Sequence, residues 1–237
     1  MKRRQALKIS SIGAMGLSAS LGSSCSQNTY FFNHGVASGD PLEDRVILWT
    51  RVTPKKPGPV ETVLEISENE NFSKIVFLKK LHTSSLSDYT IKYDFLAKKY
   101  CDSDKWFFYR FRAGNAISEI GKSKTFSENT SAAKIGIFSC SNYPAGYFNA
   151  YQAAAKKNDL DLWLHLGDYL YEYPMGGYAT DNAEKLGRVP KPLHEMISLS
   201  DYRQRHAQYK LDEGSKALHK NAPLIAVWDD HEFSNDA

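Results

Sequence analysis

Three short apolar segments of the sequence are each followed by side chains that can bind metal ions. Cys140 follows the first segment, Asp168 follows the second and Asp230 follows the third. Runs of this length and composition predict buried strands of a parallel sheet. The carboxyl ends of such strands lie along one edge of the sheet, so we expect the three groups to lie close together.

Each of these side chains also has an explanation that involves no metal. Cys140 could be a small core residue, Tyr171 could be an aromatic packing residue, and Asp230 could cap a helix. Their coincidence at three consecutive strand ends favours a metal site instead. A buried carboxylate such as Asp168 is costly unless it is paired or metal-bound. As a bridging ligand it would suit two metal ions about 3.5–4 Å apart, the arrangement that hydrolyses phosphoesters.

The donor types indicate which ions such a site would hold. A thiolate from Cys140 and a phenolate from Tyr171 favour a trivalent or thiophilic metal such as iron. Carboxylate and amide oxygens suit calcium, magnesium or manganese at the second position. We expect His231 to stay uncoordinated and to act as the catalytic residue that stabilises or protonates the leaving oxygen.

The elements that must position these side chains have a β-α-β-α-β order. Two helices are predicted between the strands, one at 144–157 and one at 201–210 with Ser200 as its N-cap. Right-handed crossovers then place the strands parallel in one sheet. The three strands are residues 134–138, 160–166 and 224–228.

The preceding region, residues 30–128, has a period-two hydrophobic pattern interrupted by turn residues about every ten positions. Six or seven short strands without a convincing helix predict a β-sandwich of immunoglobulin or fibronectin type. A polar linker at 127–133 separates it from the second domain, at 134–237. The predicted strands are 46–52, 62–66, 74–81, 89–95, 106–112 and 117–126.

Residues 1–29 have the features of an export signal. A basic start is followed by a weakly apolar run that is too short to span a bilayer. The segment at 2–8 is similar to a twin-arginine signal, although an ordinary secretory leader also fits. Cys25 lies close to a lipoprotein cleavage box, and the sequence leaves open whether it carries a lipid anchor. The expected location is the periplasm or surface of a bacterium.

Composition and charge argue against some classes of protein. The chain has 237 residues with 42% hydrophobic residues, which is enough for a sizeable core. Its formal net charge is +3, but four basic residues lie among the first eight, so the rest of the chain is nearly neutral. Nothing therefore indicates a nucleic-acid-binding surface. Three cysteines, of which Cys25 lies in the leader, do not form a disulfide framework.

Several stretches resemble the PhoD-type alkaline phosphatases, and together they cover essentially the whole chain after the leader. The similar stretches are FNHGVASGDP at 32–41, VILWTRV at 46–52, FSCSN at 138–142, GDYLYEYP at 167–174, WDDHE at 228–232, DYR at 201–203 and Tyr209.

This resemblance implies a calcineurin-like metallophosphatase domain behind an immunoglobulin-like domain, with export through the twin-arginine machinery. It implies a site with Fe³⁺ and Ca²⁺ that hydrolyses phosphomonoesters and phosphodiesters. Carried over to this sequence, Cys140 and Tyr171 are iron ligands and Asp168 is the bridge. Asp230 occupies the place of the usual metal-binding Asn, and Asn235 is a weaker candidate ligand for the second ion.

The sequence departs from the family pattern in length. Calcineurin-like sites take further ligands from later strands, typically an Asp and a Gly-(His/Asp)-x-His turn, and no such turn occurs before Ala237. The chain therefore looks like the first part of the enzyme, and we expect its strand at 224–228 to form an unpaired edge. The alternative is a non-catalytic exported fragment whose β-sandwich only binds a surface or partner.

Overall fold

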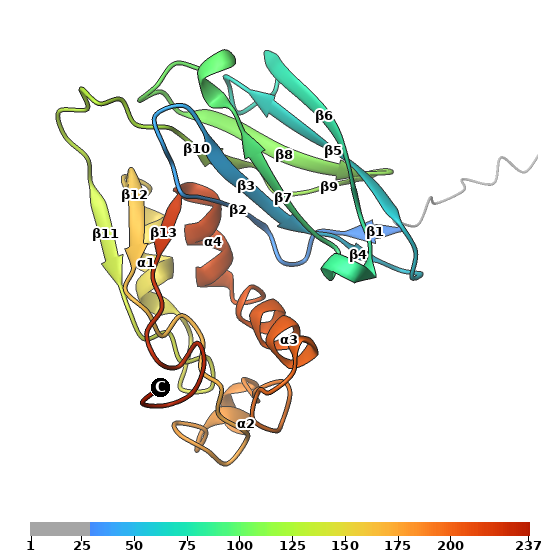
Figure 1. Ribbon diagram of the computed structural model, residues 1–237, viewed down its shortest axis with the longest axis vertical. Helices are drawn as coiled ribbons and strands as arrows, with labels where there is room; N and C mark the ends of the chain where they lie inside the picture. The colour runs from blue at the N-terminus through green and yellow to red at the C-terminus, as the bar shows by residue number, and fades with distance from the viewer. Residues whose placement is uncertain (1–28) are drawn as a thin grey trace, which may run out of the picture.

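The computed structural model describes residues 29–237 (Figure 1). The predicted export signal and Cys25 lie outside the described residues, so these predictions stay untested. Within the described part, none of the helices has both the length and the apolar character needed to cross a membrane.

Thirteen strands and four α-helices make up the described part of the chain. The strands are β1 (Tyr30–Phe31), β2 (Val36–Gly39), β3 (Val46–Arg51), β4 (Thr53–Pro54), β5 (Val60–Ser67), β6 (Ile75–Thr83), β7 (Thr90–Phe95), β8 (Phe107–Ala113), β9 (Ala116–Ile117), β10 (Gly121–Ser123), β11 (Ile135–Phe138), β12 (Leu162–His165) and β13 (Leu224–Ala226). The helices are α1 (Asn149–Lys157), α2 (Ala183–Leu186), α3 (Leu199–Tyr209) and α4 (Glu213–Asn221), with short 3₁₀ turns η1 (Ser85–Ser87) and η2 (Ala97–Lys99).

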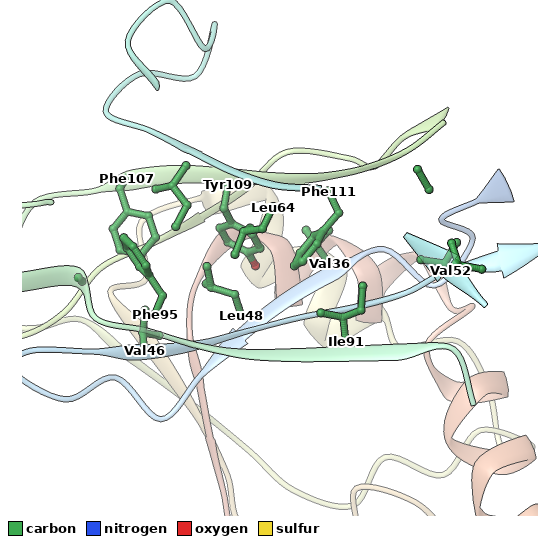
Figure 2. Packing of buried hydrophobic residues seen from close by; sticks show 14 residues of the cluster. Val36, Val46, Leu48, Val52, Leu64, Ile91, Phe95, Phe107, Tyr109 and Phe111 are labelled. Atoms are coloured by element: carbon green, nitrogen blue, oxygen red, sulfur yellow. The ribbon is translucent and has the colours of Figure 1, made fainter. Parts of the chain in front are cut away.

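Two packed antiparallel β-layers form most of the N-terminal region, and β1 and β4 form a separate two-stranded sheet. One layer is the five-stranded sheet β10-β8-β5-β6 with β9 added to β8, and the other contains β2, β3 and β7. Buried residues alternate with more accessible ones along β3 and β8, so one side of each strand faces the space between the layers. Leu48, Leu64, Phe95 and Phe111 fill that space and are fully buried (Figure 2). This packing of two sheets follows the period-two pattern of the sequence.

The strands of the C-terminal region extend the same sheet. The order β11-β12-β13-β2-β3-β7 is continuous, with β11, β12 and β13 parallel as predicted. Leu224 of β13 pairs in parallel with Gly39 of β2. The expectation that the strand at 224–228 forms an unpaired edge is therefore wrong at Leu224, the one residue of β13 that pairs with β2. The sequence could not show this pairing, since β2 comes from the preceding region.

Helices α1 and α4 cover one face of β11, β12 and β13 (Figure 1). Trp163 is fully buried at the centre of that contact, against Tyr151 of α1 and Leu218 of α4. The other face carries Ile135 and Ile137, which are 47% and 62% exposed. Within residues 29–237, no helix is packed against that second face in the way α1 and α4 cover the first.

Two helix predictions need correction, and one further helix was missed. The first helix begins at Asn149 rather than at residue 144, because the residues before it form turns. The N-cap of α3 is Ser198, whose hydroxyl accepts the N–H of Asp201 in a reciprocal capping box, and not Ser200. Helix α4 was not predicted, since Gly214 and its short length weaken the helical pattern.

Candidate metal centre

Asp168 lies on a sharp turn directly after β12. Gly167 and Asp168 both have positive φ angles, 104° and 53°. A Cβ atom at Gly167 would lie 2.4 Å from the Cβ of Asp229, so glycine allows the loops after β12 and β13 to meet. The loop after β11 joins them, because the N–H of Ser141 donates to the carbonyl of Asp168 (2.8 Å).

The carboxylate of Asp168 is 8% exposed and lies between two of the predicted ligands. Its Oδ2 accepts from the hydroxyl of Tyr171 (3.1 Å) and from the thiol of Cys140 (3.4 Å). Its Oδ1 is buried without a hydrogen-bond partner. A buried carboxylate oxygen without a donor is costly, and a cation is the partner that would satisfy it. The residues therefore fit a metal ion at this point.

Asp230 and His231 complete the group from the third strand end. One ligand atom from each of these residues and one from Asp168 all lie within 4.8 Å of one another. The backbone N–H of Asp236 donates to Asp230 (2.6 Å) and lowers the pKa of that carboxyl, which keeps it ionised. The predicted convergence of the three strand ends is thus what the structure shows, whereas the role of each side chain stays a prediction.

Asn235 is engaged elsewhere. Its side-chain oxygen accepts from the hydroxyl of Tyr173 (2.8 Å), and its amide nitrogen donates to Asp236 (2.7 Å). A different amide, that of Asn142, has both side-chain atoms buried without a hydrogen-bond partner and follows Cys140 by two residues. Asn142 was not among the predicted ligands. It ends the FSCSN stretch, and a polar amide so close to the cysteine was the signal that could have identified it.

Tyr171 is 6% exposed. Burial, followed by the charge of Asp168, raises the pKa of its phenol well above the ordinary value. These protein groups alone therefore hold Tyr171 in its neutral form. A phenolate at this position would need a strong positive charge beside it, as a metal ion would supply.

Two glutamates that sequence reasoning left without a role hold the site in place. Glu172 is 2% exposed; its Oε2 lies 3.0 Å from Nδ1 of His231, and its Oε1 accepts the N–H of Asn235 (2.8 Å). Glu232 accepts the backbone N–H groups of Asp168 (3.1 Å), Tyr169 (2.5 Å) and Asp229 (2.8 Å). Both residues occur in the similar stretches, but their neighbours in space could not be derived from spacing.

Helix α3 fixes the loops from outside the centre. The hydroxyl of the buried Tyr209 accepts the N–H groups of Tyr143 (3.1 Å) and Tyr171 (3.3 Å), and so joins the loops after β11 and β12. The fully buried Arg205 donates to the carbonyls of Tyr171 and Tyr173. Arg205 and Tyr209 are four positions apart, so both lie on the face of α3 that is turned toward the site.

Comparisons with known proteins identify the family. A family model described as "PhoD-like phosphatase" matches residues 135–236, and one described as "PhoD-like phosphatase, N-terminal domain" matches residues 17–127. The chain belongs to the PhoD-like phosphatases. Alkaline phosphatase D of Bacillus subtilis (strain 168) is 38% identical over 224 residues, which are 88% of this chain and 36% of that protein. A solved structure of PhoD has a TM-score of 0.78 and 36% identity, and the match covers 86% of this chain and 40% of that one.

This PhoD-like chain thus spans little more than a third of the length of the curated relative that it matches. The resemblance found in the sequence is confirmed by both family matches. The mixed sheet and its few helices have their counterpart in the solved PhoD structure.

Proposed function

We propose that this chain belongs to an exported, metal-dependent alkaline phosphatase and phosphodiesterase that acts on phosphate esters through a two-metal site. The observation that carries the proposal is the buried carboxylate of Asp168, which has one unpartnered oxygen and lies among groups from three strand ends. Membership of the PhoD-like phosphatases supports the same reaction class. The finer fold assignment, an immunoglobulin-like domain followed by a metallophosphatase domain, is part of this proposal.

The type of donor atom assigns each proposed ligand to one of the two proposed ions. Cys140, Tyr171 and Asp168 would hold Fe³⁺, because a thiolate and a phenolate suit a trivalent ion. Asp168 and Asp230, with Asn235 or Asn142 as an amide ligand, would hold Ca²⁺. When bound, the two ions would polarise the phosphoryl group and activate a water molecule.

His231 is the residue of this chain that we assign to proton transfer. Glu172 accepts a hydrogen bond from Nδ1 in the tautomer that leaves Nε2 free, and it thereby fixes the orientation of the ring. The ring also packs against Tyr171, with 4.4 Å between the ring centroids. His231 would protonate or stabilise the leaving oxygen from this position.

Metal analysis tests the ligand assignment. We expect purified protein to contain iron and calcium, and we expect Cys140→Ser and Asp168→Asn each to lose most of the iron, because a hydroxyl or an amide is a poor substitute for a thiolate or a bridging carboxylate. Cys101→Ser is the matched control, since Cys101 is the other free cysteine among the described residues and lies in the sandwich. Iron at the wild-type level in Cys140→Ser would reject the assignment.

A hydrolysis assay with a chromogenic phosphoester tests the activity. For the chain as given, supplied with iron and calcium, we expect little or no turnover, because Ca²⁺ alone takes about six to eight oxygen ligands and the described residues bring together few. Robust turnover that Asp168→Asn abolishes would show that these residues suffice for catalysis. A protein that binds neither metal would instead favour the non-catalytic, surface-binding alternative.

Export supplies a further test, independent of catalysis. Loading of metal ions before export requires folding in the cytoplasm, which a twin-arginine route permits. We therefore expect Arg3→Lys combined with Arg4→Lys to keep the folded protein inside the cell. Fractionation of periplasm, membrane and cytoplasm measures this outcome. Undiminished export of the double variant would indicate an ordinary secretory leader.

A further inference from the structure

A cleft separates helix α3 from the sheet strands β3 and β7. Its volume is about 560 Å³. Residues from one face of the helix and from its C-cap line the cleft, among them Tyr202, Arg203 and Lys210. The sheet contributes Trp49, Arg51 and Lys92. Figure 1 shows α3 lying opposite the β-sandwich layer that contains β3 and β7. Cys140, Asp168 and Tyr171 do not line this cleft.

The charges around the cleft are unbalanced. Four cationic side chains line it, and Asp88 is the one carboxylate among its lining residues in the described chain. Asp88 is already committed to Arg51, with two hydrogen bonds of 2.8 and 3.0 Å. Lys92 and Arg203 form no ion pair with a carboxylate among the described residues, so positive charge exceeds negative charge in the cleft.

The cationic side chains keep donors for a ligand. Arg203 donates one N–H to the carbonyl of Leu86 (2.7 Å), which leaves further donors of its guanidinium group. Lys92 is exposed on β7, directly opposite Trp49 in the strand register. Lys210 is less available to a ligand, because its ammonium group is hydrogen-bonded to Nε2 of His219 (2.5 Å).

The remaining wall of the cleft is apolar and partly aromatic. The indole of Trp49 and the ring of Tyr202 lie on opposite sides, one from the sheet and one from the helix. The ammonium group of Lys210 is 5.5 Å from the centroid of the Trp49 ring. A flat apolar group next to a charged head group would contact both kinds of surface.

We propose that the cleft between α3 and β3–β7 is a second binding site, separate from the metal centre, for a small organic phosphate or phosphonate dianion with a flat apolar group. The dianion would contact Lys92 and Arg203, and the flat group would pack on Trp49. The proposal does not depend on the proposed phosphatase activity. The ligand would contact the helix whose other residues, Arg205 and Tyr209, hold the loops of the metal centre.

Titration calorimetry with phenylphosphonate, which lacks a hydrolysable ester bond, tests the proposal in the presence of a chelator. We expect saturable one-to-one binding, and about tenfold weaker binding for Lys92→Glu, because a charged hydrogen-bond partner is replaced by a repelling one. Lys79→Glu makes the same charge change on exposed β6, away from the cleft, and should bind as the wild type does. Methylphosphonate, which lacks the ring, should bind several-fold more weakly.

Asp168→Asn separates the two sites, since it should bind phenylphosphonate with unchanged affinity. Thermal unfolding of each variant establishes that it is folded. Absence of binding, or binding that neither Lys92→Glu nor Arg203→Gln weakens, would overturn the proposal. Equal losses for Lys79→Glu and Lys92→Glu would also overturn it, because they would indicate a general charge effect.

Discussion

The two ends of the six-stranded sheet differ in what covers them. At the β2-β3-β7 end, one face packs on the five-stranded sheet, and fourteen buried residues form a single core (Figure 2). At the β11-β12-β13 end, helices cover one face, and the core between them has five buried residues. Ile137 of β11 is 62% exposed there, and Val227, directly after β13, is 52% exposed. The candidate metal centre lies at this second end.

This difference suggests a division of roles within one sheet. A closed apolar core stabilises its strands without help from polar groups. The loops of the candidate metal centre are held instead by hydrogen bonds with Glu172, Glu232, Arg205 and Tyr209. A row of apolar side chains on an uncovered sheet face is the kind of surface that a further layer covers in larger α/β proteins.

Truncation of matched apolar residues should produce the largest contrast in stability. Leu64 is fully buried between the layers, so Leu64→Ala should lower the free energy of unfolding by about 3 kcal/mol. Ile137 is 62% exposed, so Ile137→Ala should cost less than about 0.5 kcal/mol. Urea unfolding measures both values. Similar costs for the two variants would mean that the two ends are equally well packed.

Loss of Glu232 should have a smaller and more local effect. Glu232→Gln leaves one carbonyl oxygen for three backbone N–H groups, and we expect a cost of about 1.5–3 kcal/mol for the charged hydrogen bonds. Amide hydrogen exchange at Asp168 and Tyr169 should accelerate, whereas exchange in β5 and β8 should not. Glu195→Gln, at an exposed position, is the control. Unchanged exchange at Asp168 would show that the loops do not depend on this carboxylate.

A third expected effect, confined to basic pH, is a pH dependence from Lys210. Burial lowers the pKa of its ammonium group to about 7, against 10.5 in the unfolded chain. Between these values the unfolded chain binds a proton that the folded chain does not, so the free energy of unfolding should rise with pH in this window. Lys210→Met should reduce that slope in unfolding curves at pH 7, 8 and 9. An equal slope in both proteins would place the ammonium group in water.

Much of the predicted secondary structure follows from local hydrophobic patterns in the sequence. Alternating residues such as those of 46–52 and 106–112 predicted strands because each strand has one face on a core, a property that neighbouring residues alone can encode. Convergence of Cys140, Asp168 and Asp230 also followed from sequence, since parallel strands place their ends at one edge. Element boundaries were less exact, as the start of α1 and the N-cap of α3 show.

Contacts between distant segments were decided only by the tertiary structure. The parallel pairing of Leu224 with Gly39 joins strands from two regions, and no local pattern specifies which strand a given edge accepts. Likewise, Glu172 meets His231 and Glu232 meets the Asp168 turn only because three loops close on one another around Gly167. Residue types and spacing thus determined which groups could bind a metal, whereas packing determined which carboxylates hold those groups in place.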